Sequence, residues 1–169
     1  MITPQYCQTM AQYNHWQNNG LRKIVKAISE DDLRMDRGAF FGSIFETLNH
    51  LLWGDLLWMS RFDGGHGPAV EADQHRALTP NKSEWDRLRF LTDGRIVEWA
   101  NRVKSVDLTG DLTWYSGMYD RELTEPKALC IAHFFNHQTH HRGQIHAMLT
   151  AAGQTPQATD LAFMAHAPS

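Results

Sequence analysis

The chain has few of the residues that mark disulfide-rich, membrane-spanning or secreted proteins. Its only two cysteines, Cys7 and Cys130, lie far apart and form no Cys-x-x-Cys pair. We therefore expect no disulfide framework, and this cysteine usage is typical of a reducing compartment. No apolar run approaches the roughly 20 residues that a membrane-spanning helix needs, and the first residues lack the basic and apolar regions of a secretory signal. These absences predict a cytoplasmic protein without a membrane partner.

An excess of charge of one sign is also missing. The sequence has 16 Lys and Arg against 19 Asp and Glu, which gives a net charge of −3. It therefore offers no basic footprint for nucleic acid or for an anionic membrane surface. Hydrophobic residues at 42% and charged residues at 21% are typical of an ordinary globular chain. A length of 169 residues predicts a single domain over residues 1–169.

Strand-like alternation is nearly absent, and helical periodicity dominates. The apolar spacing predicts long helices over about residues 3–29, 41–62, 83–106 and 126–152. We expect Ser83 to cap the third helix, Val106 to end its buried stripe, and Gly153 to end the fourth helix. Four long amphipathic segments indicate an all-α four-helix bundle, and the two longer connections, after the second and third helices, leave room for crossovers. Residues 112–123 allow either a short hairpin or an aromatic loop.

Histidine, in contrast, is abundant. Five of the ten histidines fall in the predicted fourth helix: His133, His137, His140, His141 and His146. On a helical wheel, His137 and His141 share one wedge of roughly 60° with the apolar stripe of that helix. An i,i+4 pair of this kind can present two imidazole nitrogens to one divalent ion. His133 with His137, and His137 with His140, are alternative pairs, but the apolar wedge favours His137 with His141.

Further ligands must come from another helix. His50 is the only histidine of the predicted second helix, and three neutral imidazoles plus water would make an open site of the catalytic type. His15, in the predicted first helix, is a further candidate ligand. The competing interpretation is that the histidines are core residues satisfied by the backbone or by Asn136, Gln138 or Gln144. We expect solvated positions for the histidines of loops and tail, His66, His75 and His166.

Three segments resemble those of a known family. The run HFFNHQTHHRGQI, residues 133–145, resembles the fourth-helix signature of the DinB family of bacterial four-helix-bundle metalloproteins. TLNHLLWGD, residues 47–55, resembles the second-helix motif of that family, and YNHW, residues 13–16, is a weaker match to its first helix. The resemblance covers essentially the whole chain.

The resemblance implies three histidine ligands, one from the second helix and an i,i+4 pair from the fourth. They map onto His50, His137 and His141, whereas His133 and His140 match family positions that are not ligands. It also implies a divalent ion, nickel or zinc, and a homodimer. Two neighbouring residues have expected structural roles: close helix approach at Gly143, and a carboxylate or helix end for Arg142.

An open three-histidine site suggests a metal-dependent enzyme acting on a small molecule, either a thiol S-transferase or a hydrolase. Hydrolysis needs a general base, and the only carboxylates near the motifs, without compelling spacing, are Glu46, Asp55 and Glu125. Thiol transfer needs no such base, because the metal itself can favour the thiolate form of a substrate. The resemblance implies a low-molecular-weight thiol as co-substrate. The alternative is a non-catalytic stress-response protein in which the ion stabilises the bundle or dimer. Catalytic residues are not assigned; Trp16, Trp53 and residues 114–119 are candidates to line a pocket.

Overall fold

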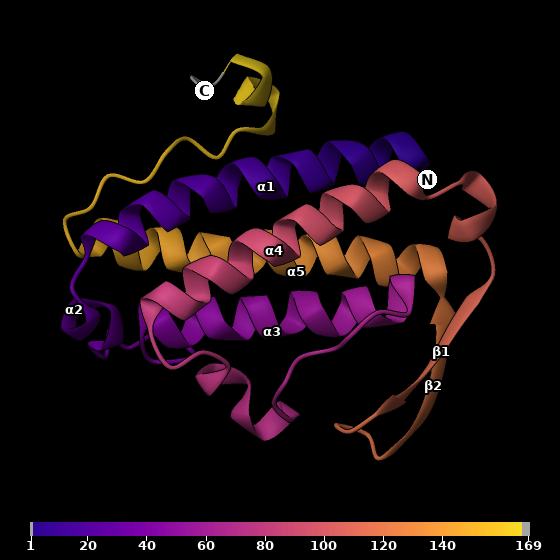
Figure 1. The fold of residues 1–169 in the computed structure, drawn as a ribbon, viewed down its shortest axis with the longest axis horizontal. Coiled ribbons are helices and arrows are strands. Elements are labelled where there is room, and N and C mark those ends of the chain that lie inside the picture. The colour runs from indigo at the N-terminus through magenta and orange to yellow at the C-terminus, as the bar shows by residue number, and fades with distance from the viewer. Residues whose placement is uncertain (1, 167–169) are drawn as a thin grey trace.

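A bundle of four long helices makes up most of the structure, a computed structural model that describes residues 2–166 (Figure 1). Helix α1 packs along α4, and α3 packs along α5 and also contacts α4. The prediction of an all-α bundle is confirmed. The helices and strands, in chain order, are α1 (Pro4–Ala27), α2 (Glu30–Arg34), α3 (Ile44–Asp63), the 3₁₀ helix η1 (Ala72–Ala77), α4 (Lys82–Arg102), the 3₁₀ helix η2 (Ser105–Leu108), β1 (Asp111–Ser116), β2 (Arg121–Pro126), α5 (Lys127–Ala151) and the 3₁₀ helix η3 (Leu161–His166).

Side-chain caps set where the long helices begin. Thr3 accepts a hydrogen bond from the backbone N–H of Tyr6 at the start of α1, and Ser43 does the same for α3. The predicted cap of the third helix was wrong by two residues. Asn81, not Ser83, caps α4, because its side-chain oxygen accepts from the N–H of Glu84.

The connection from α3 to α4 and the connection from α4 to α5 both contain short regular elements. Residues 64–81 include η1, which packs against α3. Residues 103–126 include η2 and an antiparallel hairpin in which Asp111 pairs with Pro126 and Ser116 with Arg121. The hairpin alternative is therefore the observed one. Val106 lies in η2 with 71% of its surface exposed, so its predicted burial was wrong. The chain leaves the helical conformation at Val103, which is extended, and the helical period does not continue beyond it.

The core is divided along the helix axes into two apolar clusters. One contains Leu21 and Val25 of α1 together with Ile145 of α5, and the other contains Cys7 of α1 and Phe134 of α5. Both cysteines are buried free thiols, as expected. None of the helices among residues 2–166 is both long and apolar enough to cross a bilayer.

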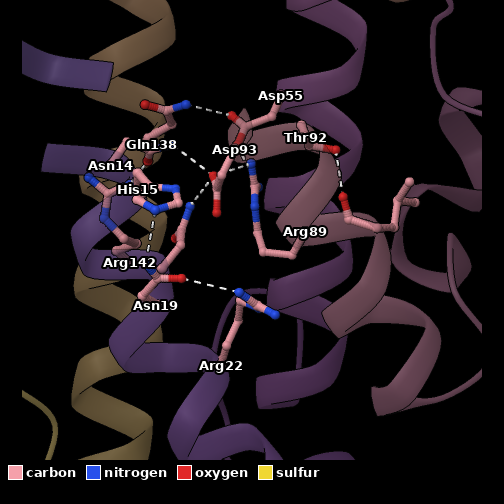
Figure 2. A network of polar contacts seen from close by, with 12 residues as sticks. Asn14, His15, Asn19, Arg22, Asp55, Arg89, Thr92, Asp93, Gln138 and Arg142 are labelled. Carbon is pink, nitrogen blue, oxygen red and sulfur yellow. Dashed lines mark hydrogen bonds and ion pairs between the residues drawn. The ribbon is translucent and has the colours of Figure 1, made fainter. Parts of the chain in front are cut away.

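A layer of buried polar side chains connects the long helices, and its members belong to neither apolar cluster (Figure 2). Arg89 of α4 pairs with Asp55 of α3 at 2.6 Å and with Asp93 at 2.7 Å. Asn18 of α1 donates to Asp93 at 2.8 Å, and Gln138 of α5 donates to Asp55 at 3.0 Å. All four long helices are thus joined through one polar network.

Arg142 of α5 belongs to the same layer. It donates to the side-chain oxygen of Asn14, and its guanidinium lies 5.4 Å from the centroid of the Tyr13 ring. Burial lowers the pKa of Arg142 to about 10, so the group stays charged at neutral pH. The expectation that Arg142 would reach a carboxylate or helix end was wrong, because an amide and an aromatic ring surround it instead.

Candidate metal centre

The structure brings together the three histidines that the resemblance singled out. His50 of α3 and His137 and His141 of α5 each offer one ring nitrogen, and these nitrogens all lie within 4.8 Å of one another. The ring centroids are 4.4 Å apart for His137 and His141, and 4.6 Å apart for His50 and His141. The i,i+4 spacing puts two rings on one face of α5, and the packing of α3 against α5 adds the third. This group could hold a metal ion.

The nitrogen spacing fits a shared ion. His50 Nε2 lies 3.2 Å from His137 Nε2. Two nitrogens that are each about 2.0–2.1 Å from one tetrahedral ion would lie about 3.3–3.4 Å apart. An ion could therefore sit between these two nitrogens, and the ligand nitrogen of His141 lies within 4.8 Å of the other two.

The outer nitrogens of the rings are held in different ways. His141 Nδ1 lies 2.7 Å from Gln144 Oε1, and because an amide oxygen only accepts, Nδ1 carries the proton and Nε2 keeps its lone pair. His50 Nδ1 lies 2.9 Å from Nδ1 of His75. His137 Nδ1 is buried and has no hydrogen-bond partner. Two of the three rings thus have the outer contact that metal-ligating histidines usually make.

A glycine on α3 makes room for one of the rings. A Cβ atom placed on Gly54 would lie 2.7 Å from Cε1 of His137, which is closer than real Cβ contacts come. The prediction of a close helix approach at Gly143 was wrong. Gly143 is exposed, and a Cβ atom there would meet nothing within 4 Å.

An aromatic ring packs against the cluster from outside the bundle helices. The Phe41 ring centroid lies 4.2 Å from that of His50 and 5.5 Å from that of His141. The helical pattern had included Phe41 in the second helix, but α3 begins at Ile44 and Phe41 lies in the short turn before it, between the bridge-paired Ala39 and Gly42. The turn, which the helical pattern does not predict, brings the Phe41 ring against the histidines.

The protein environment keeps the three imidazoles neutral. Burial, with a further contribution from neighbouring imidazoles, lowers the pKa of His50 and of His137 to about 3. Burial also lowers the pKa of His141 below its usual value. Neutral imidazole is the form that binds a divalent ion. No carboxylate of the described residues belongs to the group, so its ligand atoms carry no charge.

His133, His140 and His15 are not members of the three-histidine group. The ring centroid of His133 lies 5.2 Å from that of Trp58, and the ring centroid of His140 lies 4.8 Å from that of His141. Both His133 and His140 are exposed. His15, the candidate fourth ligand, accepts a hydrogen bond at 3.0 Å from the side-chain amide of Asn19 in the polar layer (Figure 2). It is not part of the three-histidine group.

The expectations for the loop histidines had different outcomes. His66 is exposed as expected. His75 was expected to be solvated, but it is half-buried against His50, so that expectation was wrong. Its position in a loop carried no signal for this contact, because only the return of residues 64–81 over α3 creates it. The side chain of His166 lies outside the described part of the chain.

The candidate general bases are engaged or distant. Asp55 is paired with Arg89 in the polar layer, and Glu46 lies 3.6 Å from Arg76. Glu125 is exposed in β2. None of these carboxylates belongs to the histidine group.

Of the candidate pocket-lining tryptophans, Trp53 lies near the histidine group and Trp16 lies elsewhere. Trp53 lies beside the site, with its ring centroid 6.0 Å from that of His75. Trp16 lies under the C-terminal segment, where its carbonyl accepts from Gln157. Trp114 packs on Trp58, while most of the hairpin tip is exposed.

Fold and site together define a helical-bundle protein with a three-histidine centre that could hold a divalent metal ion. A family model described as the DinB family matches residues 1–168, so the chain belongs to the DinB family. The chain is similar to Protein DinB of Bacillus subtilis (strain 168), with 26% identity over 154 residues, 88% of this chain and 87% of that protein.

Proposed function

We propose that the protein is a divalent-metal-dependent enzyme of the thiol S-transferase type that acts on a small molecule, with His50, His137 and His141 as the metal ligands. The observation that carries this proposal is the convergence of three neutral imidazoles without a carboxylate among them. Three protein ligands leave a coordination position for water or substrate, which is the pattern of catalytic rather than structural zinc sites. His50 and His137 are only partly buried, so the group is not sealed inside the core of the bundle.

The charge of the site favours an anionic reactant. Three neutral ligands leave the full double positive charge of an ion uncompensated, because no carboxylate shares the site. A divalent ion, when bound, supplies Lewis acidity and lowers the pKa of a thiol or water in the open position. The low dielectric of a half-buried site strengthens its attraction for a thiolate.

The surrounding side chains support thiol transfer over hydrolysis. Asp55, the carboxylate of the second-helix motif, is held by Arg89 and Gln138, and so is not free to accept a proton from water. Glu46 faces Arg76 and accepts a hydrogen bond from Ser43. A thiol, once ionised, is its own nucleophile and needs no such base.

The alternative is a non-catalytic protein whose ion only stabilises the bundle or a dimer. The polar layer argues against it, because Arg89, Asp55 and Asp93 already join the helices without an ion.

The proposal includes zinc or nickel as the metal, since both suit imidazole ligands. It further includes a low-molecular-weight thiol as co-substrate, a homodimeric state and a cytoplasmic location, with no nucleic-acid or membrane partner.

Native metal analysis combined with activity assays tests the proposal. The purified protein is expected to hold about one zinc or nickel per chain and to transfer a panel of small thiols to electrophiles. His141→Ala should abolish both, whereas His146→Ala, on the same helix but outside the group, should leave both unchanged. Thiol transfer that survives in metal-free protein would refute the enzyme proposal. Stoichiometric metal with no activity on the panel would favour the non-catalytic alternative.

A further inference from the structure

One histidine outside the three-histidine group is held against a member of it. His75 belongs to η1, in the connection between α3 and α4, and its Nδ1 lies 2.9 Å from Nδ1 of His50. Their ring centroids are 4.6 Å apart and the rings are inclined at 75°. His75 is 25 residues from His50 in the sequence, so only the tertiary fold produces this contact.

The connection that carries His75 is anchored on both sides of His50. Trp53, three residues after His50, donates from Nε1 to the carbonyl of Val70 at 2.9 Å. Asn49, directly before His50, accepts from both the backbone N–H and the hydroxyl of Thr79, at 3.0 and 2.7 Å. His75 lies between these two anchor points along the chain, so its position against His50 is fixed rather than incidental.

We infer that His75 is a positioning residue, which accepts the Nδ1–H of His50 and so holds His50 in the tautomer whose Nε2 faces His137. This inference rests on the proposed metal function. A neutral imidazole has one N–H and one lone pair. If His50 donates from Nδ1, its Nε2 lone pair is free, and that Nε2 is the atom 3.2 Å from His137. The same hydrogen bond therefore fixes both the protonation and the direction of the ring.

The geometry separates His75 from the ligands. The two nitrogens of one imidazole point to different sides of the ring, and His50 uses Nδ1 for His75 and Nε2 for the side of His137. His75 is not among the residues whose ligand atoms lie within 4.8 Å of one another. It therefore acts through His50, in the way that Gln144 acts through His141.

Partners of this kind typically change metal affinity by about 10–100-fold when they are removed. We expect His75→Ala to weaken Zn²⁺ binding by about that factor in a competition titration with a chelator. His75→Asn should restore most of the affinity, because its amide oxygen can take the place of Nδ1 as the acceptor. His66→Ala is the matched control, since His66 is exposed in the same connection and should have no effect.

The number of coordinated imidazoles distinguishes a positioning residue from a ligand. X-ray absorption of the Zn²⁺ proteins should count three imidazoles in both the unsubstituted protein and His75→Ala, and circular dichroism should show that the metal-free variant is folded. Unchanged affinity in His75→Ala, a fourth imidazole that His75→Ala removes, or an Asn variant as weak as the Ala variant would each overturn the inference. If the unsubstituted protein binds no metal, the proposed function itself fails.

Discussion

Two polar clusters lie in the same bundle, and they differ in whether opposite charges are paired within them. In the polar layer, Arg89 faces two carboxylates, Asp55 and Asp93, and amides from α1 and α5 fill in around them. In the histidine group, Nε2 of His50 faces Nε2 of His137 at 3.2 Å, and no opposite charge is present. The charges of the first cluster are paired within the protein, whereas the converging nitrogens of the second would find a positive charge only in a bound ion.

This difference separates a structural role from a functional one. Buried charges are tolerated when they are paired and hydrogen-bonded, and breaking such a pair leaves an uncompensated charge. Converging neutral nitrogens instead lose little when the site is empty, because burial keeps the imidazoles uncharged. The polar layer should therefore govern folding stability, and the histidine group should govern metal binding.

The largest expected effect on stability comes from the polar layer. Arg89→Ala removes a buried guanidinium and leaves Asp55 and Asp93 without their counter-charge, so it should cost about 3–5 kcal/mol of unfolding free energy. Urea denaturation of the metal-free protein measures this. Arg87→Ala is the control, because Arg87 is exposed two residues away and pairs with Glu84 at the surface of the same helix. Equal unfolding midpoints for the two variants would contradict the structural role of the layer.

The largest expected effect on metal binding comes from the histidine group. His137→Ala or His141→Ala should each weaken Zn²⁺ or Ni²⁺ binding by at least about 100-fold, because two imidazoles hold a divalent ion much less well than three. Elemental analysis after dialysis reads out the loss. His133→Ala and His146→Ala lie on the same helix and should keep the metal. Full retention in both ligand variants would show that the group is not the metal site.

Acid should act first on the histidine group. The pKa of His50 and His137 is about 3 in the folded protein and about 6.5 in an unfolded chain. The unfolded state therefore binds more protons between these values, so the stability of the metal-free protein should be highest above pH 6.5 and fall as the pH drops towards 3. Denaturation at several pH values measures the slope.

A double variant separates the contribution of the histidines to this pH dependence of stability from that of the carboxylates. Between about pH 6.5 and 4.5 most carboxylates stay ionised, so the slope there belongs mainly to histidine. The double variant His50→Ala, His137→Ala should have a smaller slope in this window. An unchanged slope would place the acid sensitivity elsewhere in the protein.

The smallest expected effects concern two glycines of the long helices, Gly54 and Gly143. Gly54→Ala would press a methyl group onto the His137 ring, so it should destabilise the protein by about 1–3 kcal/mol and weaken metal binding. Gly143→Ala meets nothing and should stabilise α5 by up to about 1 kcal/mol through helix propensity. Thermal unfolding and Zn²⁺ titration of both variants test this. Identical behaviour of the two would mean that Gly54 does not make room for His137.

The sequence by itself determined the features that repeat along a helix. The 3.6-residue period predicted the ends of the four long helices with errors of no more than a few residues. The i,i+4 spacing put His137 and His141 on one face, because helical geometry is local. The family motifs singled out His50, and the packing of α3 against α5 brings it to that pair. That these three bind a metal remains a prediction.

Only the tertiary structure decided which residues support this group. His75 and Phe41 reach it from segments outside the long helices, and Gly54 matters because the His137 ring crosses from α5 to α3 at that position. The polar layer likewise needs side chains from four helices to meet at one level of the bundle. Local spacing fixes the face on which a side chain lies, but the path of the connections and the register of the helices decide what it contacts.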